Sequence, residues 1–161
     1  MSLATDNAAR AKPQHSAPSL INEEPWVGHI ADHDLLATAY NLPVAGAAFV
    51  IGAEATNVIN VGIQLSDNDG NDLAVGAVFQ AFLSDDSGGD SIASTAPDTS
   101  VGVGTDGAII VEHTTDLAWT LQSEADGAID LDIEETSTDT WFLVVVLPSG
   151  LQIVSAAITF A

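Results

Sequence analysis

The chain has 161 residues and a formal net charge of -21, with 23 acidic residues against two basic ones. A surface this acidic repels phosphate backbones and anionic lipid headgroups, which disfavours binding to nucleic acid or to a membrane. The hydrophobic fraction of 47% argues against an acidic disordered protein, and the lack of cysteine excludes disulfides and thiolate metal sites.

Residues 1–44 differ in composition from the rest of the chain. Four of the six prolines and three of the four histidines lie in this segment. Because prolines break long helices and central strands, we expect an extended N-terminal arm, with one short helical turn over residues 32–40. Its polar first 18 residues predict no secretory signal. Fully extended, an arm of this length would reach about 140 Å.

Three residues of the arm are candidates for partner binding. Arg10 and Lys12 are the only basic side chains of the chain and could meet acidic patches on a partner. Trp26 follows Glu23-Glu24-Pro25, and an isolated tryptophan is a good anchor for a pocket on a partner. The alternative for Trp26 is packing back on its own folded domain.

His29 and His33 are spaced four residues apart, which would place both imidazoles on one face of a helix as metal ligands. Gly28 and Pro25 make a helix uncertain at this point, and no third ligand is evident. We therefore expect no metal in the arm.

From residue 45 onward, apolar and polar residues alternate with a period of two, which is typical of half-buried β-strands. Asp-Gly and Pro-Ser-Gly sequences punctuate the alternation and predict tight turns, while residues 84–100 predict a polar loop. Residues 45–161 are thus expected to form one all-β domain, an Ig-like antiparallel β-sandwich of seven to eight strands. The expected strands cover 57–65, 75–83, 107–111, 117–121, 129–133, 141–147 and 151–160.

Two of these strands carry a specific expectation. In the strand over 129–133, Ile129, Leu131 and Ile133 should be buried, with Asp130 and Asp132 facing water. The segment 141–147 is apolar on both faces, so it should lie at the centre of a sheet or beneath a subunit contact.

Two acidic loops are candidate calcium sites, because hard cations prefer several converging oxygens. The run Asp67–Asp72 resembles part of a calcium loop, but Leu65 occupies the position of the first EF-hand ligand and no glutamate closes the loop. Asp85, Asp86 and Asp90 could also chelate a cation. A hydrogen-bonded hairpin and solvated loop acids account for the same residues, so we expect no metal at either place.

Support for catalysis is thin. His113 is the only histidine of the domain and lies beside Glu112 and near Asp116, where it could act as a general base. An exposed histidine at a strand end needs no such role, and no Gly-x-Ser-x-Gly sequence is present. We expect no catalytic residues and no cofactor.

Five stretches of the domain carry a family resemblance: 52–61, 64–65, 123–127, 146–150 and 157–160. Together they resemble Ig-like virion structural proteins of tailed bacteriophages, a group that includes capsid decoration (cement) proteins and head fibres. The resemblance extends over about residues 45–161 and transfers no functional residue. It implies a non-enzymatic component on the outer capsid surface, often a homotrimer, with the major capsid protein and neighbouring copies as partners.

The leading hypothesis is therefore a capsid decoration protein that binds the outer shell through its N-terminal arm and stabilises the capsid. The alternative is a phage tail or fibre component, or an adhesion module that binds carbohydrate through calcium. A hydrolase is the third and weakest hypothesis.

Overall fold

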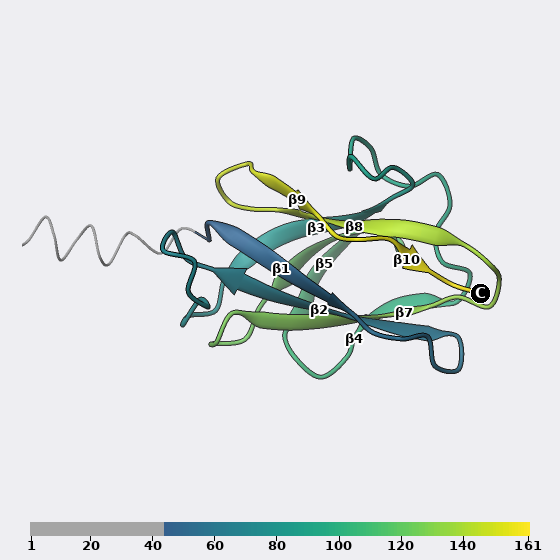
Figure 1. Cartoon of the computed structure of the whole chain (residues 1–161), viewed down its shortest axis with the longest axis horizontal. Coiled ribbons are helices and arrows are strands. Elements are labelled where there is room, and N and C mark those ends of the chain that lie inside the picture. Colours follow the sequence, from purple (N-terminus) through teal and green to yellow (C-terminus); the bar gives the residue numbers. More distant parts are fainter. Residues whose placement is uncertain (1–43) are drawn as a thin grey trace, which may run out of the picture. The chain divides into compact units, whose positions relative to one another are not determined.

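The computed structural model describes residues 44–161, which contain ten β-strands and no helix (Figure 1). The strands form two antiparallel sheets, and the inward side chains of both sheets make one hydrophobic core. The predicted all-β antiparallel sandwich is confirmed. The strands are β1 (Gly46–Ile51), β2 (Val58–Ser66), β3 (Val78–Ser84), β4 (Ser100–Val103), β5 (Ala108–Thr114), β6 (Ala118–Gln122), β7 (Ala128–Glu134), β8 (Thr140–Val146), β9 (Gln152–Val154) and β10 (Ile158–Thr159).

The smaller sheet has the strand order β1-β2-β7-β4. On β7, Ile129, Leu131 and Ile133 are at most 1% exposed, as the alternation predicted. Asp130 and Asp132 point to the opposite face, but they are only partly exposed. The reason is that Asn60 of β2 donates hydrogen bonds to both carboxylates, at 2.6 and 2.7 Å.

The larger sheet has the order β10-β8-β3-β6-β5, with β9 also paired to β8. β8 therefore lies inside the sheet, which is the central position predicted for residues 141–147. Its outward residue Val144 is fully buried as well. The long loop between β3 and β4 covers it: a Cβ atom placed on Gly89 would lie 2.9 Å from methyl groups of both Val144 and Val154.

Trp119 and Trp141 both lie in the core and are 0% exposed. The indole N–H of Trp141 donates to the carbonyl of Thr95 at 3.2 Å, and its ring meets Phe160 edge to face with centroids 6.1 Å apart. The indole N–H of Trp119 has no hydrogen-bond partner among the described residues.

The predicted number of strands, seven to eight, is too low. The sequence does not predict β4, because its four residues with a central glycine give little alternation. The expected strand over 151–160 is two strands, β9 and β10, separated at Ser155–Ala157. The Ser155 hydroxyl accepts from the amide of Leu143 and donates to the carbonyl of Ala156, so side-chain bonds interrupt the ladder.

Candidate functional site

Charge is distributed unevenly over the domain. Residues 44–161 contain 18 of the acidic residues and neither of the two basic ones. Most of the acids lie in turns and loops, and β7 adds three on the outer face of the smaller sheet. By contrast, β3, β6 and β8 contain no charged residue at all, and they are neighbours in the larger sheet.

The outward side chains of these three strands form what we call the uncharged face: Val78, Gln80, Phe82, Ala118, Thr120 and Val146. Gln80 lies at its centre, opposite Thr120 on one side and Val146 on the other. It lines two shallow hollows, one of about 350 Å³ that extends to Pro148 and one of about 220 Å³ that extends to Ile92 and His113. A partner could bury this face without burying an unpaired charge.

His113 lies at the margin of the uncharged face. Its Nε2 is 2.7 Å from the hydroxyl of Thr120. The two acids that sequence reasoning grouped with it are engaged elsewhere. Glu112 accepts from the amide of Asp116, and Asp116 accepts from the amide of Val101 at 2.7 Å. Glu112 therefore fixes the backbone of the β5–β6 connection, and Asp116 ties that connection to β4.

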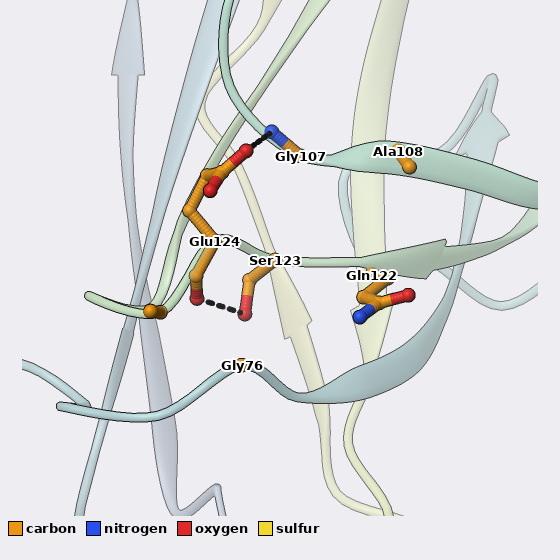
Figure 2. Close-up of a pocket in the computed structure, with 7 residues that line it drawn as sticks. Gly76, Gly107, Ala108, Gln122, Ser123 and Glu124 are labelled. Atoms are coloured by element: carbon orange, nitrogen blue, oxygen red, sulfur yellow. Dashed lines mark hydrogen bonds between the residues drawn. The ribbon is translucent and has the colours of Figure 1, made fainter.

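A pocket of about 320 Å³ opens between the residues before β3 and the β5 and β6 strands, and Figure 2 shows the residues that line it. The Ser123 hydroxyl accepts from the amide of Ala77 at 3.0 Å and donates to the Glu124 carbonyl at 3.3 Å. The Glu124 carboxylate turns towards the amide of Gly107, which donates to it at 3.3 Å. The side chains of Ser123 and Glu124 are thus both bonded to backbone groups, and no histidine lines the pocket.

The two candidate calcium loops are held by internal hydrogen bonds. Asp67 accepts from the amides of Asn71 and Asp69, and these bonds lower the pKa of Asp67 below its ordinary value. Asp85 accepts from both the amide and the hydroxyl of Ser94. No group of three or more histidines and acids within residues 44–161 is arranged to hold a metal.

One cluster was missed by sequence reasoning. Glu135 is only 2% exposed, and its carboxylate accepts from the amides of Asp98 and Ser137 at 2.9 and 2.7 Å. Asp98 in turn accepts from the hydroxyl and amide of Thr136, which lower the pKa of Asp98. The pair ties the long loop to the β7–β8 connection without a basic residue. Ser or Thr residues next to each acid were the only signal.

Arg10, Lys12 and Trp26, the predicted partner-binding residues, lie outside the described residues, as do His29 and His33. Within residues 44–161 there is no helix that could cross a membrane. Comparison of the chain with known protein families gives no matching family model, and no curated protein matches it.

Proposed function

We propose that this protein is a non-enzymatic decoration protein of a bacteriophage capsid, which binds the outer surface of the shell and stabilises it. The observation that carries this proposal is the separation of charge over the domain. Eighteen acids and no basic residue occupy residues 44–161, while the uncharged face covers three adjacent strands. The resemblance of residues 45–161 to virion structural proteins supports the same conclusion.

The charge favours the outer side of a shell over the inner side. A genome packed inside a capsid is a dense polyanion, and a domain without lysine or arginine has no group with which to neutralise phosphates. On the outer side, the acidic surface faces solvent, where its charges are hydrated and screened.

The uncharged face supplies a surface for the shell. Desolvating an acid without a partner is costly, so docking through the acidic surfaces would need basic residues on the shell at each contact. Docking through Gln80, Thr120 and Val146 carries no such requirement. The N-terminal arm adds the contacts of Arg10, Lys12 and Trp26 with shell subunits.

Binding to bare shells of the same phage tests this proposal. Deletion of residues 1–43 should abolish or strongly reduce occupancy, because the arm contributes the basic residues and the tryptophan anchor. Gln80→Glu should also reduce occupancy, because it places a charge at the centre of the uncharged face. Thr138→Glu adds the same charge at an exposed position in the β7–β8 connection and serves as the control.

Full occupancy by the truncated chain would contradict binding through the arm. Equal occupancy by the Gln80 and Thr138 variants would contradict docking through the uncharged face. If the full-length chain does not bind the shells at all, the proposed function is wrong.

A further inference from the structure

The edges of the two sheets are not equally protected against pairing with another strand. Natural proteins guard edge strands by keeping them short or by placing charges, prolines or bulges in them. In the described part of the chain, β4, β9 and β10 have only four, three and two residues. β5 is longer, but it contains Glu112 and His113 and two register shifts against β6.

β1 is the exception. It is an edge strand of six residues that pairs with β2 over its whole length without a register shift, and it contains no charge and no proline. Figure 1 shows it beside β2, and no strand within residues 44–161 pairs with its other side. Val50 of β1 is 73% exposed, more than any other large hydrophobic side chain of the described residues.

The backbone of β1 offers a regular set of donors and acceptors on its free side. The amide of Gly52 donates to the carbonyl of Asn60, which fixes the alternation of the β1–β2 ladder. Even-numbered residues of β1 therefore bond to β2, and the N–H and C=O groups of Ala47, Phe49 and Ile51 point away from it. The side chains of these three residues pack against the core.

The distribution of charge around β1 favours a second copy of the chain as the strand that pairs with it. β1 and β2 together contain no charged residue, and the nearest acids on the sheet face are Asp130 and Asp132 of β7, two strands away. If two copies met edge to edge, five strand spacings of about 4.8 Å would separate the two β7 strands, or roughly 24 Å. That distance is about three Debye lengths at physiological ionic strength, so the repulsion between these faces would be screened.

We propose that β1 pairs with β1 of a second copy of this chain, antiparallel about a two-fold axis, so that two four-stranded sheets become one. With Phe49 opposite Phe49 of the second copy, Ala47 meets Ile51, and every outward N–H and C=O group of the three residues finds a partner. In this register Val50 packs beside Ala48 of the second copy. This contact between two copies can form in solution, without a capsid shell.

Salt should control this association. Asp67 follows the residue of β2 that pairs with Gly46, and Glu54 lies just beyond Ile51. Antiparallel pairing brings Asp67 of one copy towards Glu54 of the other copy. Their repulsion is long-ranged at low salt and short-ranged at high salt.

Light scattering and amide hydrogen exchange on the full-length chain test the proposal. We expect monomers in 0.05 M NaCl and dimers in 1 M NaCl. In the dimer, the amides of Ala47, Phe49 and Ile51 should become protected, whereas those of Ala48 and Val50 are protected at both salt concentrations because they bond to β2.

Two variants test whether the free side of β1 forms the contact between the two copies. Ala47→Pro removes one outward N–H, and proline is tolerated on the free side of an edge strand. Val50→Glu adds a like charge to each copy at the contact. Both should remain monomeric in 1 M NaCl, whereas Leu151→Glu, which charges an exposed side chain outside β1, should dimerise like the parent chain.

A trimer in solution, as the family resemblance implies, would overturn the two-fold contact. So would a monomer in 1 M NaCl, or a dimer in which the three amides stay unprotected. None of these outcomes bears on shell binding, which is measured separately with bare shells.

Discussion

Asp130 shows how a carboxylate can be held in this domain without any basic residue. Its Oδ1 accepts from the amides of Thr105 and Asp106 at 2.9 and 2.6 Å, and its Oδ2 accepts from Asn60. Burial acts to raise the pKa of Asp130, but these hydrogen bonds outweigh it, and the pKa lies below the ordinary value of 3.8. The residue fixes the β4–β5 connection onto the smaller sheet.

Asp130→Asn should therefore destabilise the domain by about 1–2 kcal/mol at neutral pH, because it weakens charge-assisted hydrogen bonds to two amides. Since the folded-state pKa is lowered, the stabilisation is fully present above 3.8 and is lost as the pH falls through the folded-state value. Urea unfolding from pH 7 down to pH 2 should show the two proteins converging in acid.

Asp132→Asn is the matched control. Asp132 accepts only from Asn60 among the described residues, and an asparagine keeps an acceptor oxygen for that bond. Its free energy of unfolding at pH 7 should stay within about 0.5 kcal/mol of the parent value. Equal losses in both variants would show that the two amide bonds to Asp130 add nothing.

At the scale of elements, the long loop between β3 and β4 is part of the packed structure. Gly89 has a φ of +69° and leaves no room for a Cβ against Val144 and Val154. Gly150, in the β8–β9 turn, has a φ of +85° but nothing within 4 Å of the same position. Both glycines have a positive φ, but only Gly89 is closely packed against other residues.

Gly150→Ala should cost about 1–2 kcal/mol, because an L-residue is strained at positive φ. Gly89→Ala should cost about 1–3 kcal/mol more, because the added methyl overpacks the loop against β8. Thermal unfolding of both variants measures the difference. Equal costs would mean that the loop lifts easily from the sheet.

Sequence patterns predicted the strands that have one solvent-exposed and one buried face. The strict alternation in β7 gave both its existence and its orientation. β1 was not delimited, because Gly46–Ile51 is small or apolar on both sides and lacks alternation. The break between β9 and β10 depends on the hydrogen bond from the amide of Leu143 to the Ser155 hydroxyl. Because Leu143 lies in β8, the sequence around Ser155 does not reveal this bond.

The candidate surfaces were less predictable than the strands. Each of β3, β6 and β8 can be recognised as uncharged from sequence, but their adjacency is a property of the topology. The contact between Glu135 and Asp98 likewise joins residues 37 positions apart. Local patterns cannot report which distant segments meet.

At the scale of the whole molecule, the excess of acids should make stability depend on ionic strength. With 18 acids and no basic residue in residues 44–161, self-repulsion opposes the compact state and is screened by salt. We expect the Tm to rise from 0.05 to 1 M NaCl at pH 7, measured at a protein concentration at which the chain is monomeric. A fall in Tm would mean that attractive charge contacts dominate.

Acid provides the internal control for this effect. Near pH 3 most carboxyls with ordinary pKa values are protonated, so the repulsion is largely absent. The rise of Tm with NaCl should then be much smaller than at pH 7. An equal rise at both pH values would point to a general effect of salt on apolar burial.

The order of strands in the sheets has a consequence for synthesis on the ribosome. β2 pairs with β7, and β3 pairs with β8, so the middle of each sheet needs a strand from the last third of the chain. Contacts so distant in sequence make folding slow, and nascent segments that lack their partners expose apolar strands. We expect the nascent chain to stay unfolded until β8 has left the exit tunnel, because the two sheets do not both have their central pairing before that point.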